Sequence, residues 1–155
     1  MKTLEASALL EVPVGIAYEV VADVGSYPDF VPGCDGVEIL EQGAAGATVA
    51  VTVSGKGIRE RFVTANTQLP NQSVTVSLRQ GPFEHLEGRW QFAALGEAGC
   101  KVTLVVTYEP KGMLAHILGG LADRMASRLV DAFAARMVAV NTRVGPMLAE
   151  PTEHV

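Results

Sequence analysis

A long apolar stripe at helical spacing occupies the C-terminal part of the chain and constrains the fold more than any other feature. Between residues 113 and 147, apolar side chains recur every three or four positions. The stripe consists of Leu114, Leu118, Leu121, Met125, Leu129, Phe133, Met137, Val140, Val144 and Met147. It predicts one helix of roughly 50 Å, or two segments if Gly119-Gly120 introduces a kink. A helix of this length with one apolar face needs an extended surface to pack against.

The residues before this helix alternate with the period of a β-strand and supply such a surface. Seven strands are expected over 3–12, 37–41, 47–53, 58–69, 73–80, 86–95 and 101–109, separated by short turns rich in glycine and proline. Between the first two strands, residues 13–22 have helical spacing, and residues 24–31 form a short helix or an irregular turn. Gly81-Pro82 ends one strand and leads into the next, on which Trp90 and Phe92 share a face.

The predicted order of elements is β-α-α-β-β-β-β-β-β-α, which defines an α+β chain. We expect a curved antiparallel sheet of seven strands around the long C-terminal helix, the helix-grip arrangement. One helix does not fill such a sheet completely, so this arrangement tends to leave an apolar cavity that suits a small hydrophobic molecule. With 155 residues, the chain should form a single domain over 1–149, followed by a flexible tail at 150–155.

Composition and residue spacing argue against several classes of function. A net charge of −5 disfavours a DNA-binding protein that uses a broad basic surface. His85, His116 and His154 are too widely separated to predict a metal site, and neither a GxSxG motif nor a phosphate-binding glycine loop is present. We therefore expect no catalytic residues, no metal and no resident cofactor. The absence of a signal-peptide pattern and of long apolar runs predicts a cytoplasmic protein, and leaves open a transient, peripheral contact with the inner membrane.

Two motifs carry a family resemblance. The segment Tyr27-Pro28-Asp29-Phe30-Val31-Pro32-Gly33-Cys34, together with the Gly81 to Phe92 segment, Gly57-Ile58 and Phe62-Val63-Thr64, resembles the coenzyme Q-binding branch of the START-like (SRPBCC) superfamily. That branch, related in fold to the Bet v-like proteins, includes ribosome association toxins and proteins labelled oligoketide cyclase or lipid transport protein. The chain departs from the pattern expected of the branch at residues 108–112 and 118–121, which puts the shape of the cavity mouth in question.

The resemblance implies a non-enzymatic protein that binds ubiquinone or a related isoprenoid lipid in its cavity and supports respiratory quinone function. The alternative that it implies is a toxin-type inhibitor, which binds the large ribosomal subunit and blocks subunit joining. For this alternative, the candidate surface on the long helix contains Arg124, Arg128, Arg136 and Arg143, diluted by Asp123 and Asp131. A polyketide cyclase or dehydrase is a third interpretation, and would need Glu60, Tyr108 or Tyr18 beside a bound substrate.

The candidate cavity wall follows from strand parity, the helical stripe and the two motifs. It consists of Tyr27, Phe30, Val51, Phe62, Leu78, Phe83, Trp90, Phe92, Leu104, Tyr108, Leu118, Leu121 and Met125. Tyr27 and Phe30 form either a rigid lip over the cavity or a plug at one end of the core. Glu60 has inward parity and is a polar cavity candidate, but we favour the interpretation that it reaches water at a strand end.

Overall fold

A computed structural model describes residues 1–55, 57–112 and 122–153 of the chain. The first half contains β1 (Lys2–Leu10), α1 (Val14–Ala22), the 3₁₀ helix η1 (Val24–Asp29), β2 (Cys34–Gln42) and β3 (Gly46–Gly55). The second half contains β4 (Ile58–Leu69), β5 (Ser73–Gln80), β6 (Phe83–Leu95), β7 (Gly99–Pro110) and α3 (Ala122–Glu153). This order confirms the predicted α+β helix-grip architecture.

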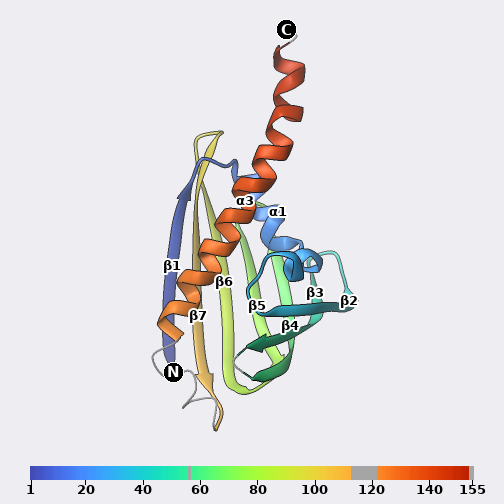
Figure 1. Cartoon of the computed structure of the whole chain (residues 1–155), viewed down its shortest axis with the longest axis vertical. Helices are drawn as coiled ribbons and strands as arrows, with labels where there is room; N and C mark the ends of the chain where they lie inside the picture. The colour runs from blue at the N-terminus through green and yellow to red at the C-terminus, as the bar shows by residue number, and fades with distance from the viewer. Residues whose placement is uncertain (56, 113–121, 154–155) are drawn as a thin grey trace.

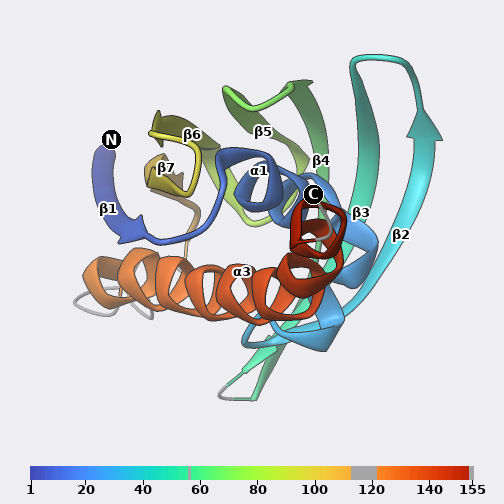
Figure 2. The same ribbon diagram turned by 90° about the horizontal axis from the view of Figure 1, so that it is seen from above.

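The seven strands form one antiparallel sheet in the order β1-β7-β6-β5-β4-β3-β2. The sheet curves into a U, and α3 crosses the open side of the U (Figures 1 and 2). α1 and η1 lie inside one end of it, where α1 contacts α3, β5, β6 and β7. The buried apolar residues of β5, β6 and β7, such as Val74, Trp90 and Leu104, therefore point into the space between the sheet and the helices.

The buried stripe of α3 differs from the predicted one at its first two described positions, where Ala126 and Val130 take the places expected for Met125 and Leu129. Met125 is 48% exposed, whereas Ala126, Val130, Phe133 and Met137 are buried. These four residues follow one another at spacings of four, three and four, which keeps them on one helix face. The apolar pattern missed this face because it counted the large Met125 and passed over the small Ala126.

Two further expectations about the helix stay predictions. The segment 113–121, with the kink expected at Gly119-Gly120 and the wall residues Leu118 and Leu121, lies outside the described residues. At the other end, α3 continues to Glu153, past the domain boundary expected at residue 149. The helix is tied to the body of the protein by Asn141, whose amide nitrogen lies 3.4 Å from the carbonyl oxygen of Glu11.

Candidate functional site

One end of the space inside the sheet is filled by aromatic rings, and we call it the closed end. Phe133 on α3 lies 4.6 Å from Trp90, 5.2 Å from Tyr27 and 4.9 Å from Phe30, measured between ring centroids. Arg136 lies 5.2 Å above the Phe30 ring and adds a cation–π contact. This packing agrees with the interpretation of Tyr27 and Phe30 as a plug, because both rings are held between η1 and α3.

The Tyr27 hydroxyl has a structural role in this cluster. It donates a hydrogen bond to the carbonyl oxygen of Val21 at the end of α1. Burial, with a smaller contribution from the nearby Asp23 carboxylate, raises the pKa of the Tyr27 phenol far above its ordinary value. Tyr27 therefore stays neutral and connects η1 to α1. Two other predicted wall residues lie beside this cluster and are almost fully buried, Phe92 against the Tyr18 ring and Leu104 as the cross-strand partner of Trp90.

The middle of the inner sheet face is loosely packed among the described residues. Gly88 faces inward between Leu86 and Trp90, and its cross-strand partners are Val106 on β7 and Val76 on β5. A Cβ atom added at Gly88 would meet no atom of the described residues within 4 Å. Val76 and Val106 are only partly buried, although they lie on central strands. We call the space over Gly88, Val76 and Val106 the central hollow.

A second aromatic group lies beyond the hollow, and we call its surroundings the open end. The Phe83 ring is 5.9 Å from Phe62 and 6.2 Å from Tyr108. Leu78 lies beside this group, because a Cβ at Gly81 would come within 3.0 Å of Leu78 and 3.3 Å of Phe62. Phe62, Leu78 and Phe83, together with Val51, the cross-strand partner of Phe62, are partly exposed. The predicted wall residues therefore separate into two aromatic groups, and in the second group Tyr108 is buried while the residues around it are partly exposed.

Strand β4 brings polar side chains to the same inner face, and these were missed from the sequence. Thr64 and Asn66 are 6% and 5% exposed, and the Thr64 hydroxyl donates a 2.9 Å hydrogen bond to Oδ1 of Asn66. Gln68, two residues further on, lies 3.4 Å from the carbonyl oxygen of Ala22. The inward parity of Phe62, extended along the strand, would have found all three residues.

Glu60 and the tyrosines do not form a catalytic group. Glu60 continues the inward parity of β4 but is exposed at the strand end, as the favoured interpretation expected. Tyr18 packs against Phe92 at an interplanar angle of 78°, whereas Tyr108 packs against Phe83 in the other aromatic group. Of the three candidates for a cyclase, Tyr18 thus lies in a different aromatic group from Tyr108, and Glu60 lies at the exposed end of β4.

Metal-binding and thiol chemistry have little support. The described residues contain no group of three or more His, Cys, Asp and Glu side chains that could hold a metal ion. Cys34 and Cys100 are buried free thiols, and burial raises the pKa of both. A raised pKa lowers the thiolate fraction, so both cysteines are suited to packing.

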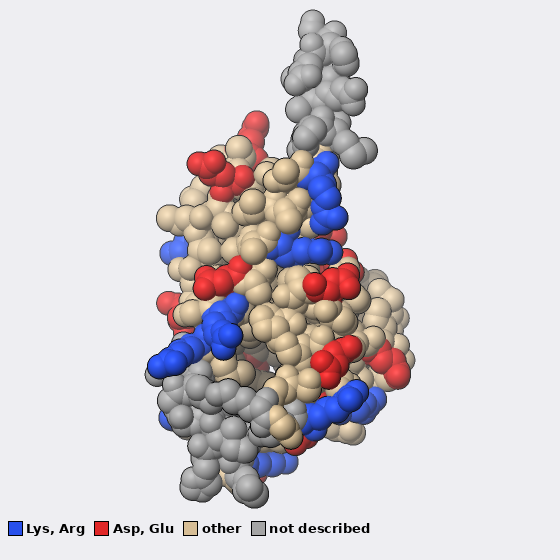
Figure 3. All heavy atoms as spheres, in the orientation of Figure 1, with Lys and Arg blue, Asp and Glu red and all other residues tan. Residues whose placement is uncertain are grey.

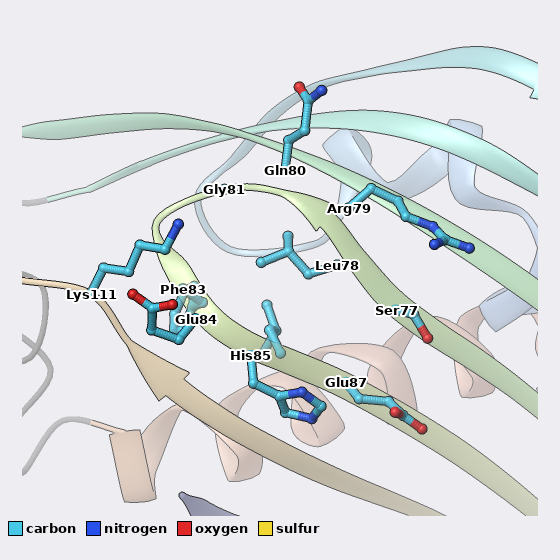
Figure 4. A pocket seen from close by; sticks show the side chains of 11 residues that line it. Ser77, Leu78, Arg79, Gln80, Gly81, Phe83, Glu84, His85, Glu87 and Lys111 are labelled. Atoms are coloured by element: carbon cyan, nitrogen blue, oxygen red, sulfur yellow. The ribbon is translucent and has the colours of Figure 1, made fainter.

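A small polar pocket lies at the β5–β6 hairpin (Figure 4). The pairing between the two strands ends at Ser77 and Glu87, and the chain beyond this point encloses about 280 Å³. Figure 4 shows side chains of both charges around it, including Arg79, Lys111 and Glu84. Its lining indicates no particular ligand.

The surface has no continuous basic region on the face that Figure 3 shows, where lysines and arginines alternate with acidic groups. Along α3, Arg124, Arg128 and Arg143 are exposed, and Arg136 is half-buried over Phe30. No helix in the described part of the chain is long and apolar enough to cross a membrane.

Comparison with curated proteins identifies relatives of two kinds. The chain is 39% identical to the ribosome association toxin RatA of Pseudomonas aeruginosa over 134 residues, which cover 86% of this chain and 93% of that protein. It is 30% identical to the mitochondrial coenzyme Q-binding protein COQ10 homolog B of Xenopus laevis, over 75% of this chain and 50% of that protein.

Solved structures show the same fold at low sequence identity. The protein TTHA0849 of Thermus thermophilus superposes with a TM-score of 0.79 at 19% identity, over 90% of this chain and 99% of that one. A START superfamily protein of Mycobacterium smegmatis gives 0.74 at 20% identity, over 89% and 98%. The model of the family described as polyketide cyclase/dehydrase and lipid transport matches residues 10–134. The chain therefore belongs to this START-like family, in the branch that contains the RatA toxins and the COQ10 proteins.

Proposed function

We propose that the protein binds ubiquinone or a related isoprenoid lipid between the sheet and α3, without catalysing a reaction, and so supports respiratory quinone function. The observation that carries this proposal is the central hollow. A folded protein packs its interior closely, yet here an inward-facing glycine has no described atom near its missing Cβ, and the two valines beside it on central strands are only half-buried. Each methylene group buried in such a space contributes about 0.8 kcal/mol, so a short prenyl segment binds usefully without polar contacts.

A direct test is to look for the lipid and then to fill the hollow. Purified protein is extracted with organic solvent, the extract is examined by mass spectrometry, and emptied protein is titrated with ubiquinone. We expect a co-purified isoprenoid lipid or saturable ubiquinone binding, and the absence of both would refute the proposal.

The variant Gly88→Leu should lower ubiquinone affinity roughly tenfold or more, the equivalent of about two buried methylene groups. Gly36→Leu is the matched control, because a Cβ at Gly36 also meets no atom within 4 Å in the described part of the chain but lies on the edge strand β2. Equal affinity of the two variants would count against the hollow as the binding site.

Binding to the large ribosomal subunit is the second candidate, and the similarity to ribosome association toxins favours it. Sucrose-gradient sedimentation of lysates should then show fewer assembled ribosomes when the protein is overproduced. Arg128→Glu on α3 should reduce this effect, whereas the exposed Arg89→Glu on the outer face of β6 should not. Unchanged ribosome profiles would exclude this activity.

Both proposed functions place the protein in the cytoplasm. A lipid carrier would in addition contact the inner membrane transiently.

A further inference from the structure

We infer that Thr64 and Asn66 form a recognition point for the carbonyl oxygen of a neutral, ring-type head group. This inference rests on the proposed lipid binding. It adds the group of the ligand, a head-group carbonyl oxygen, that the protein would recognise by hydrogen bonding. The two residues are neighbours of the central hollow. Asn66 is the cross-strand partner of Val76, which in turn pairs with Gly88, so the three residues lie in one row across the inner face.

The hydrogen bond within the pair orients the amide. Because Thr64 donates to Oδ1 of Asn66, the amide NH₂ group is the end that stays available, and no hydrogen bond between described residues uses it. An amide NH₂ offers two donors and no acceptor. A ligand that meets it must therefore present an acceptor, such as a carbonyl oxygen.

The surroundings select a neutral acceptor over a charged one. Thr64 lies between Leu78 on β5 and Val49 on β3, and Asn66 lies between Val76 and Ala47. A carboxylate or phosphate buried among these apolar side chains would lose its hydration without gaining a cation. A quinone carbonyl loses much less hydration free energy on burial, and a single well-aligned hydrogen bond compensates for that loss.

The position of Asn66 is held by the backbone as well as by Thr64. A Cβ at Gly46 would lie 2.0 Å from the carbonyl oxygen of Asn66, so β3 approaches β4 here more closely than any other residue would allow. On the other side, Gln68 lies within hydrogen-bonding distance of the end of α1. Along β4, the partly exposed Phe62 precedes Thr64 and Asn66. A ligand that enters from the open end would therefore meet Phe62 first and the polar pair second.

The test compares two probes that share a tail, ubiquinone with two isoprene units and a hydrocarbon of the same prenyl length. The wild-type protein should bind the quinone more tightly than the hydrocarbon, and one buried hydrogen bond contributes about tenfold to this preference. Asn66→Leu should lower the preference by about that factor and leave hydrocarbon affinity within about twofold. Thr64→Val should reduce the preference by a smaller factor, because it only frees the amide to rotate. Asn141→Leu on α3 is the control and should keep the full preference.

Infrared difference spectra of the bound quinone give a readout that a purely structural role would not move. The carbonyl stretch should lie at lower frequency in the wild type than in Asn66→Leu. If the wild type binds neither probe, lipid binding itself is refuted. If the wild type and Asn66→Leu bind both probes with the same preference and the same carbonyl frequency, lipid binding stands and the role of Asn66 is refuted. If Asn66→Leu fails to fold, Thr64→Val replaces it, because valine preserves the shape of threonine. An unchanged quinone preference and carbonyl frequency in Thr64→Val would then refute the role of the polar pair.

Discussion

The closed end and the open end of the inner face are built from similar residues but differ in how they are enclosed. Each is built around one central ring, Phe133 or Phe83, that lies 4.6 to 6.2 Å from two or more other rings. At the closed end, Phe133 of α3 packs on three other rings, and Trp90 and Phe133 are 5% and 3% exposed. At the open end, Tyr108 is 5% exposed, whereas Phe62 and Phe83 are partly exposed. Aromatic content alone therefore does not separate core from binding wall, because each end contains both buried and partly exposed rings.

The largest effect is expected from removing the ring on which the closed end is built. Trp90→Ala should lower the free energy of unfolding by about 4 kcal/mol, because it leaves a large cavity beneath Phe133. Urea denaturation followed by circular dichroism measures this change. A loss below about 1 kcal/mol would mean that the closed end is as loosely packed as the open one.

The corresponding change at the open end should cost less. Phe83→Ala is expected to lower the free energy of unfolding by about 1.5 kcal/mol, since the ring already meets solvent in the folded protein. The same urea experiment checks it. A loss equal to that of Trp90→Ala would contradict the distinction between the two ends.

Tyr27→Phe probes the closed end through pH. Removing the hydroxyl leaves the Val21 carbonyl without its donor and should cost about 1 kcal/mol at neutral pH. The raised pKa of Tyr27 in the folded protein has a further consequence, because the unfolded chain ionises first, at about pH 10. Wild-type stability should therefore fall as the pH rises above about 10, and Tyr27→Phe should fall less steeply. Parallel curves would contradict the assignment.

The smallest effect is expected at the central hollow. Gly88→Ala places a methyl group in open space and should change the free energy of unfolding by less than about 0.5 kcal/mol. Thermal unfolding monitored by circular dichroism is sufficient to detect a larger change. Strong destabilisation would show that the space over Gly88 is already filled in solution.

The sequence was enough to predict the architecture, because the change from a two-residue to a helical period is a local signal. It also placed Trp90 and Phe92 inside the molecule. The sequence did not locate the central hollow, because a glycine in a strand does not indicate whether the space beside it is filled by other side chains. The polar pair was passed over because threonine and asparagine on a strand usually face water, and only the parity set by Phe62 indicates otherwise.

The pairing of β1 with β7 joins residues about a hundred positions apart, such as Thr3 and Thr107. The contacts of α3 with β1 and α1 span an even longer stretch of chain. Contacts of such high sequence separation form late, and on a translating ribosome the contacts of α3 form only after α3 has emerged. Until then the inner face lacks the cover that α3 provides, so a lipid or a chaperone that meets the nascent chain encounters apolar surface rather than a finished cavity.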